Sequence, residues 1–163
     1  MRCASIDRGR AFDWGKTSQS YAKYRDIYPE EFYEHVRAAG IGLPGQEILD
    51  IGTGTGVLPR HMARYGAHFT GADLSENQIA EARRLTAEAG LSIDYFVCPA
   101  EEIDFPDGSF DAVTACQCFW YFDKAVLLPR IARMLKPGGR LCVLTMNWLP
   151  EEDPLAKASE ELV

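Results

Sequence analysis

The chain has 163 residues, 47% hydrophobic and 25% charged, a composition typical of a globular domain large enough to bury a core. It carries 17 Lys and Arg against 24 Asp and Glu, a formal net charge of −7, which argues against nucleic acid as a partner. No apolar run approaches the roughly 20 residues that cross a bilayer, so we expect no membrane partner and a cytoplasmic location.

The chain is predicted to be one domain in three parts. Residues 1–42 carry aromatic residues at helical spacing and predict an N-terminal helical cap, in which Pro29 separates two short helices. Residues 43–146 alternate apolar strands with helices, and residues 147–163 begin a C-terminal region. The predicted strands are 47–51, 68–72, 92–97, 110–116 and 140–145, and the predicted helices are 58–65, 76–89, 124–135 and 154–162.

Two local signals support these boundaries. Ser75 and Gln78 form an S-x-x-Q capping box before the helix over 76–89, and Asp123 can cap the helix that follows it. The segment 136–139, Lys-Pro-Gly-Gly, predicts a turn into the last strand.

The alternation predicts an α/β fold with a doubly wound, Rossmann-like parallel sheet. Its strands are apolar on both sides, which indicates helices on both faces. Right-handed crossovers favour the strand order 3-2-1-4-5, which places a ligand crevice at the carboxyl ends of strands 1 and 4.

A glycine cluster, Gly52 to Gly56, lies between the first predicted strand and the next helix. Glycines there allow tight turning and close approach of a ligand, and the helix start offers free N–H groups. Asp73 ends the second strand, where a carboxylate can accept ribose hydroxyls. Together they predict a nucleoside-containing ligand; a plain strand–helix corner beside a solvated acid is the alternative.

The glycine pattern is not the dinucleotide fingerprint, because Val57 stands where its third glycine would be. The sequence instead has G-x-G-x-G preceded by Asp50, which resembles motif I of the class I S-adenosylmethionine-dependent methyltransferases. The small-molecule branch with a methyltransferase type 11 core is the most similar. Four further segments resemble that family: Asp73-Leu74-Ser75, Ala100-Glu101, the FPDGSFD stretch 105–111 and the LKPGG stretch 135–139.

The resemblance implies S-adenosylmethionine as cofactor and methyl transfer to a small-molecule acceptor by in-line displacement. It implies that Gly52, Thr53 and Gly54 line the methionine moiety. Asp50 would reach the ammonium group, directly or through water, and Asp73 would hold the ribose hydroxyls.

The resemblance also implies contacts at the two ends of the cofactor. Leu74 would pack on the adenine face, and Ala100 would offer its N–H to adenine N1 with Glu101 beside it. Cys116 would touch the methionine portion, with Gln117 next to it. Core packing remains the alternative for Cys116.

Tyr21 and Arg25 resemble the N-terminal helix that closes over the cofactor, and a surface helix with a buried aromatic stripe is the alternative. The sequence departs from the family at Pro99, where an acidic residue is usual. It departs again at Phe119 to Phe122, where related sequences often carry a His-Trp pair. This aromatic run predicts an apolar wall of the substrate pocket or, alternatively, core packing.

No catalytic residue is predicted, because the sequence shows no triad or carboxylate pair. Tyr121 and Gln117 are candidates for facing the substrate. Two other functions stay open: a cofactor-binding module without turnover, and a nucleotide-binding oxidoreductase, which Val57 disfavours. The five cysteines are expected to be reduced thiols, and no metal site is predicted, since the three histidines form no ligand pair.

Members of the resembled family normally continue past strand 5 into strands 6 and 7. We expect this sequence to lack these strands, so strand 5 is expected to be an exposed edge. We therefore expect either a shortened version of a longer protein or a homodimer in which a second copy covers this edge.

Overall fold

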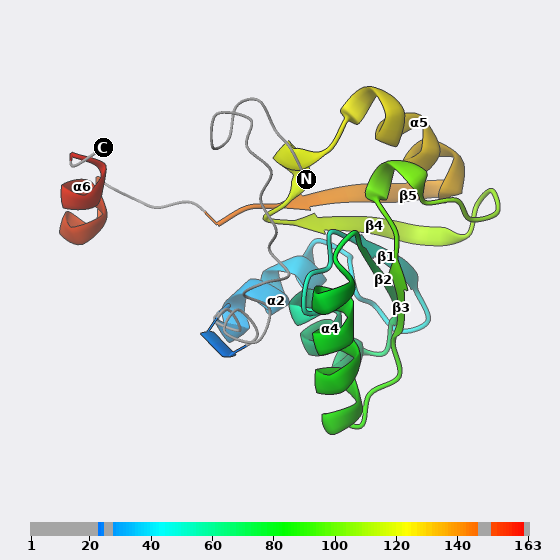
Figure 1. Cartoon of the computed structure of the whole chain (residues 1–163), viewed down its shortest axis with the longest axis horizontal. Helices are drawn as coiled ribbons and strands as arrows, with labels where there is room; N and C mark the ends of the chain where they lie inside the picture. The colour runs from blue at the N-terminus through cyan, green and yellow to red at the C-terminus, as the bar shows by residue number, and fades with distance from the viewer. Residues whose placement is uncertain (1–22, 25–27, 147–150, 162–163) are drawn as a thin grey trace.

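A computed structural model describes residues 23–24, 28–146 and 151–161 (Figure 1). Its strands are β1 (Glu47–Ile51), β2 (His68–Asp73), β3 (Asp94–Val97), β4 (Phe110–Cys116) and β5 (Leu135–Leu144). Its α-helices are α2 (Glu30–Ala38), α3 (Val57–Met62), α4 (Glu76–Glu88), α5 (Lys124–Met134) and α6 (Pro154–Glu160). Three short 3-10 helices are η3 (Ala63–Tyr65), η4 (Ala100–Glu102) and η5 (Phe119–Tyr121).

The strands form one sheet in the order β3-β2-β1-β4-β5, and every neighbouring pair is parallel. The predicted fold class and strand order are confirmed. The order reverses between β1 and β4, so the loops after these two strands diverge and leave room between them for a ligand.

Helices cover both faces of the sheet, and successive side chains of each strand point to opposite faces. Ile48 and Ala112 belong to a core cluster with α2 and α3. Their neighbours Leu49 and Val113 belong to a second cluster with α5. Figure 1 shows α2 and α4 on one side of the sheet and α5 on the other. Burial on both faces explains why these strands are apolar throughout.

The predicted N-cap of α4 is present, but only half of the capping box forms. Ser75 Oγ accepts the Gln78 N–H at 3.4 Å, as the S-x-x-Q pattern predicts. The Ser75 N–H instead donates to Asp73 Oδ1 at 2.8 Å. The Gln78 Oε1 is buried and has no hydrogen-bond partner within the described part of the chain. The Asp73 carboxylate therefore accepts the Ser75 N–H, which the Gln78 side chain would accept in a complete capping box.

The prediction that the last strand begins at Arg140 was wrong, because β5 already begins at Leu135. Leu135 pairs with Phe110, and Arg140 pairs with Ala112, so the strand contains an irregularity opposite Asp111. The Lys-Pro-Gly-Gly turn is this bulge, and Gly138 supplies its positive φ of 81°. Pairing on both sides of the turn makes it part of the strand.

Most other boundaries differ from the prediction by one or two residues, but the helix predicted to end at Tyr65 ends at Met62 and continues as η3. The helix after the glycine cluster begins at Val57, and the third strand begins at Asp94 rather than at Ser92. Asp123 caps α5, since its Oδ1 accepts the N–H groups of Ala125 and Val126. Within the described residues, no helix combines the length and the apolar character needed to span a membrane.

Candidate cofactor site

A pocket opens where β1 and β4 end, at the switch point of the sheet. Five of the residues predicted to contact the cofactor line it together. Its lining residues are Tyr28, Asp50, Gly52, Thr53, Gly54, Thr55, Val57, Leu58 and Cys116.

The glycine cluster turns the chain sharply from β1 into α3. Gly52 and Gly54 have φ angles of 63° and 56°, which L side chains rarely adopt. The loop is tied to the neighbouring strand, because the Thr53 N–H donates to the Ala72 carbonyl oxygen at 3.0 Å. A Cβ at Gly54 would meet nothing within 4 Å, so the loop backbone is open to a ligand there.

Gly56 has a packing role within the same loop. A Cβ at this position would lie 2.3 Å from Tyr95 Oη, and its φ is 73°. The Tyr95 ring also fills the space beside Gly71, and its hydroxyl lies 3.0 Å from Thr86 Oγ1. Burial raises the pKa of Tyr95 to about 12, so it stays neutral beneath the loop.

The Asp73 carboxylate connects the glycine loop to the start of α4. Its Oδ2 accepts the Gly54 N–H at 3.0 Å, and its Oδ1 accepts the Ser75 N–H at 2.8 Å. Burial raises the pKa of Asp73, while the two N–H bonds oppose that change. The residue predicted to hold the ribose therefore also shapes the loop beside it.

Asp50 is the most deeply buried acid of the pocket, with 2% of its surface exposed. Its Oδ1 accepts a hydrogen bond from Thr114 Oγ1 at 2.6 Å. Burial raises the pKa of Asp50 to about 6, against the hydrogen bond of Thr114, which lowers it. Asp50 is therefore mainly ionised at neutral pH.

Cys118 packs against Gly52 of the glycine loop. Its thiol donates to the Ile51 carbonyl oxygen at 3.2 Å. A Cβ at Gly52 would lie 2.8 Å from Cys118 Sγ and 3.2 Å from the Phe122 ring. Burial raises the pKa of Cys118, which keeps the thiol protonated. This close packing explains why only glycine fits at position 52.

Cys116 lies at the end of β4 and lines the pocket directly. Its Sγ lies 3.6 Å from Tyr28 Oη, to which it donates. Tyr28 stacks on Phe32 with ring centroids 4.7 Å apart, which holds it against α2. The pocket therefore has a wall from the N-terminal segment as well as from the sheet.

Gln117 follows Cys116 but does not line the pocket. Its φ of 59° is unusual for a non-glycine residue, and its N–H donates to the Leu144 carbonyl oxygen at 2.9 Å. Its side-chain Nε2 donates to the Met146 carbonyl oxygen at 3.1 Å. In this structure Gln117 joins β4 to the segment after β5.

The residues predicted for the adenine end lie after β2 and β3. Leu74 is 44% exposed, as a residue that packs on a ligand face would be. Ala100 is 7% exposed and begins η4. Glu101 Oε1 accepts the Asp123 N–H at 2.8 Å, so this side chain joins η4 to the start of α5.

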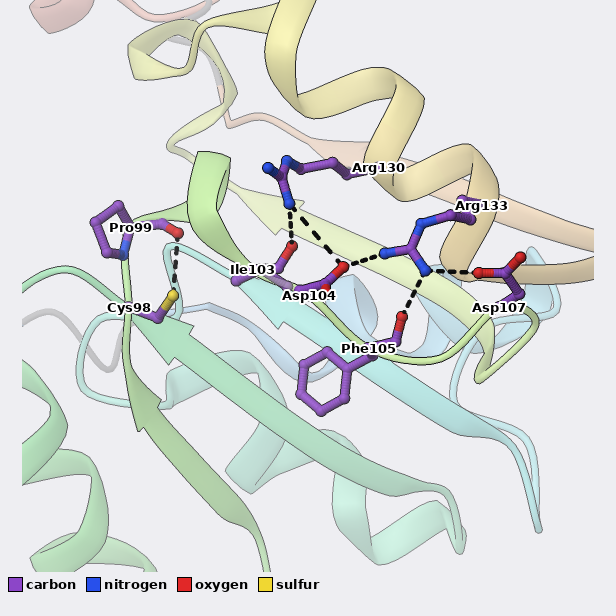
Figure 2. A network of polar contacts seen from close by, with 8 residues as sticks. All are labelled: Cys98, Pro99, Ile103, Asp104, Phe105, Asp107, Arg130 and Arg133. Atoms are coloured by element: carbon purple, nitrogen blue, oxygen red, sulfur yellow. Dashed lines mark hydrogen bonds and ion pairs between the residues drawn. The ribbon is translucent and has the colours of Figure 1, made fainter.

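Figure 2 shows how the chain beyond η4 is held against α5. Arg133 Nη1 donates to the Phe105 carbonyl oxygen at 3.0 Å and to Asp107 Oδ1 at 2.6 Å. Arg133 Nη2 donates to Asp104 Oδ1. Arg130 Nη1 donates to the Ile103 carbonyl oxygen at 3.4 Å. Two arginines one turn apart thus fix the backbone of the loop that follows the predicted adenine contacts.

The remaining candidates are Tyr21, Arg25 and Tyr121. Tyr21 and Arg25 lie outside the described residues. Tyr121 lies in η5 with its ring 5.6 Å from that of Trp120, and neither lines the pocket. In the described part of the chain, no group of three or more His, Cys, Asp or Glu side chains is placed to hold a metal ion.

The sequence analysis missed four lining residues, Tyr28, Thr55, Val57 and Leu58, and it missed Thr114, which contacts the pocket residue Asp50. Tyr28 was assigned only to an aromatic stripe, and nothing in its spacing distinguishes a pocket residue from a core residue. For Thr114 the sequence does carry a signal, because a threonine interrupts the apolar strand Phe110–Cys116. In the structure its hydroxyl is fully buried. A buried polar group in such a strand needs a partner, and here the partner is Asp50.

Comparison with known proteins places the chain in a family. The family profile described as "Methyltransferase domain" matches residues 49–143. A ubiquinone biosynthesis O-methyltransferase of Xanthomonas campestris pv. campestris (strain B100) is 37% identical over 128 residues, 77% of this chain and 54% of that protein. One of Hahella chejuensis is 34% identical over 156 residues, 94% of this chain and 64% of that protein. The chain spans about half the length of the first of these relatives.

Solved structures share the fold. The [4+2]-cyclase SpnF is 33% identical with a TM-score of 0.65, over 69% of this chain and 43% of that one. A SAM-dependent methyltransferase of Geobacter sulfurreducens, solved in complex with S-adenosyl-L-homocysteine, is 24% identical with a TM-score of 0.67, over 81% of this chain and 55% of that one. The motifs, the sheet order and the profile match agree, and the chain belongs to the class I S-adenosylmethionine-dependent methyltransferase family.

Proposed function

We propose that this chain binds S-adenosylmethionine in the pocket at the ends of β1 and β4. The observation that carries the proposal is the convergence of Asp50, the 52–54 backbone and Cys116 on one pocket, with Asp73 bonded to the loop beside it. A buried acid suits the ammonium group of the ligand, and a glycine loop allows close approach of its amino-acid chain. The second acid, at the end of β2, suits the ribose hydroxyls.

The residues present fit this cofactor. Gly54 leaves open space where a side chain would otherwise fill the pocket. Asp50 supplies a buried carboxylate for an ammonium group, and no cation of the described residues contributes to its pKa. Asp73 keeps acceptor capacity for ribose hydroxyls, because each carboxylate oxygen can accept more than one hydrogen bond.

The reaction proposed for the protein is methyl transfer to an oxygen of a small-molecule acceptor. The two similar proteins named ubiquinone biosynthesis O-methyltransferase support an oxygen acceptor. S-adenosylmethionine supplies an electrophilic methyl carbon attached to a good leaving group. The chain's own residues bind and orient: the 52–54 backbone and Asp50 hold the amino-acid end, and Tyr28 and Cys116 form the nearby wall.

Binding and turnover need separate tests. Calorimetric titration with S-adenosylhomocysteine and with NAD tests the ligand, and binding of NAD alone would refute the proposal. Transfer of a labelled methyl group to hydroxylated aromatic and aliphatic acceptors then tests activity. A chain that binds S-adenosylhomocysteine but methylates no acceptor would support the binding-only alternative. The [4+2]-cyclase relative shows that the fold also occurs in a protein named for other chemistry.

The setting we propose is cytoplasmic, with a small molecule as partner. Cys98, Cys116, Cys118 and Cys142 are free thiols, as a reducing compartment favours. The net charge of −7 disfavours a nucleic-acid partner. We also propose residues 43–146 as the cofactor-binding core of a single domain that residues 1–42 cap.

The described part of β5 is a sheet edge, and its Val143 is 41% exposed. We propose that a second copy can cover this edge, which would make a homodimer. Sedimentation velocity tests the proposal, since a monomer over the whole concentration range would contradict it.

A further inference from the structure

Asp50 and Thr114 face each other across two neighbouring strands. They are register partners on β1 and β4, although 64 residues separate them in sequence. Thr114 Oγ1 donates to Asp50 Oδ1 at 2.6 Å, and the two residues are 0% and 2% exposed. A charge-assisted hydrogen bond shielded from water in this way is among the stronger ones in proteins.

The bond makes the two oxygens of the Asp50 carboxylate inequivalent, because Thr114 donates to Oδ1 only. Thr114 has one hydroxyl proton, and this bond directs it to Oδ1. The Thr53 hydroxyl is buried and has no hydrogen-bond partner among the described residues. Asp50 lines the pocket, whereas Thr114 does not. Thr114 therefore acts on the pocket only through Asp50.

No positive side chain of the described residues balances the charge of Asp50. The charged group that affects it is the Asp73 carboxylate on β2, which raises its pKa further. Cys118 and Tyr95 also face it, and its charge raises the pKa of each. Both therefore stay neutral. The hydroxyl of Thr114, which donates to Oδ1, opposes the cost of burying this carboxylate.

Resting on the proposed function, we propose that Thr114 is a positioning residue for the amino-acid end of the cofactor. Its hydroxyl keeps Asp50 ionised and oriented, so that the carboxylate can accept the ligand's ammonium group.

The sign of the pH effect follows from the bond. A hydrogen bond donated to the ionised carboxylate lowers its pKa, which burial has raised to about 6. Loss of the Thr114 hydroxyl would raise that pKa further. At a pH below this pKa, Asp50 is protonated and no longer pairs with an ammonium group. Cofactor affinity would then begin to fall at a higher pH than in the wild type.

The test uses the full chain with two probes. S-adenosylhomocysteine carries the amino-acid end, whereas 5′-methylthioadenosine has the same adenosine and thioether without it. Dissociation constants are measured by calorimetry between about pH 5 and about pH 8.5, a range that brackets the pKa of Asp50. The variants are Thr114→Val, which removes the hydroxyl at similar volume, and Thr114→Ser, which keeps a hydroxyl.

We expect Thr114→Val to weaken S-adenosylhomocysteine binding about fivefold near pH 6 and to move the pH midpoint up by about one unit. Its affinity for 5′-methylthioadenosine stays within about twofold of the wild type at each pH. Thr114→Ser restores the wild-type profile. This second probe also reports any effect of Asp73 protonation and any general loss of folding.

An unchanged pH midpoint in Thr114→Val would overturn the inference, and so would an equal loss of affinity for both probes. Should Thr114→Val fail to fold, Thr114→Cys replaces the hydroxyl by a weaker donor, and a wild-type profile there would also overturn it. If the wild type binds neither probe, the proposed function itself fails. These results are distinguishable, because only the last concerns the wild-type chain.

Discussion

The Asp73 carboxylate accepts the backbone N–H of Gly54 at 3.0 Å, which joins the end of β2 to the glycine loop after β1. Its second oxygen accepts the Ser75 N–H at the start of α4. A single acid thus connects two loops that the family resemblance assigns to different parts of the cofactor. These two bonds hold the glycine loop against the end of β2 and the start of α4.

Asp73→Asn is expected to lower both stability and cofactor affinity. An amide has one acceptor oxygen, so one of the two N–H groups would face an NH2 group instead. We expect a loss of about 1–2 kcal/mol in the free energy of unfolding and about tenfold in affinity for S-adenosylhomocysteine. Urea denaturation and calorimetry measure the two effects. Asp94→Asn, an exposed acid at the start of β3, is the control. Equal stability of both variants would contradict the prediction.

Asp50→Asn is expected to stabilise the ligand-free protein above about pH 6. The pKa of Asp50 is raised from 3.8 to about 6, so the ionised form costs folding free energy above that pH. The wild type therefore regains stability as the pH falls from about 6 towards 4, and the variant shows no such gain from this site. The difference is on the order of 3 kcal/mol at pH 7.

Urea denaturation of both proteins between about pH 4 and about pH 8 measures this difference. Calorimetry should show weaker binding of S-adenosylhomocysteine to the more stable Asp50→Asn variant. A variant less stable than the wild type at pH 7 would refute the predicted cost of the buried charge.

Alanine substitutions at Gly54 and Gly56 should separate binding from stability. At Gly56 the new Cβ would lie 2.3 Å from Tyr95 Oη, so we expect a loss of about 2–4 kcal/mol in unfolding free energy. At Gly54 the space is open, so only the left-handed backbone costs stability, about 1 kcal/mol. The Gly54 methyl group would instead occupy the pocket and weaken S-adenosylhomocysteine binding.

Gly90→Ala is the matched control, since Gly90 has a φ of 66°, open space around it and a place at the end of α4 away from the pocket. Thermal denaturation and calorimetry on the three variants give both quantities. A Gly56→Ala protein as stable as Gly90→Ala would contradict the packing role of Tyr95.

Arg133→Ala is expected to loosen the loop over residues 103–109 with little change in global stability. Arg133 is an exposed residue whose side chain bonds to Asp104, Phe105 and Asp107 (Figure 2). Exposed ion pairs contribute little to folding, but these bonds hold a loop that has no regular structure of its own. Hydrogen exchange should accelerate in this loop alone. Arg84→Ala, which removes ion pairs within α4, should leave its exchange unchanged.

Most of the architecture was predictable from local patterns. The apolar runs 47–51, 68–72 and 110–116 are buried on both faces, so their composition alone identifies them as strands of a covered parallel sheet. Chirality of the crossovers then leaves few strand orders. The start of β5 was missed, because Leu135 becomes part of a strand only by pairing with Phe110, which no local pattern reports.

The sequence by itself determined the order of elements, the glycine loop and the acids that end β1 and β2, because backbone conformation and hydrophobic periodicity act over a few residues. Only the tertiary structure decided that Thr114 bonds to Asp50, that Glu101 accepts the Asp123 N–H, and that Tyr28 lines the pocket. These contacts join segments from 22 to 88 residues apart. Sheet register and helix packing bring such segments together, and neither is encoded in the spacing of neighbouring residues.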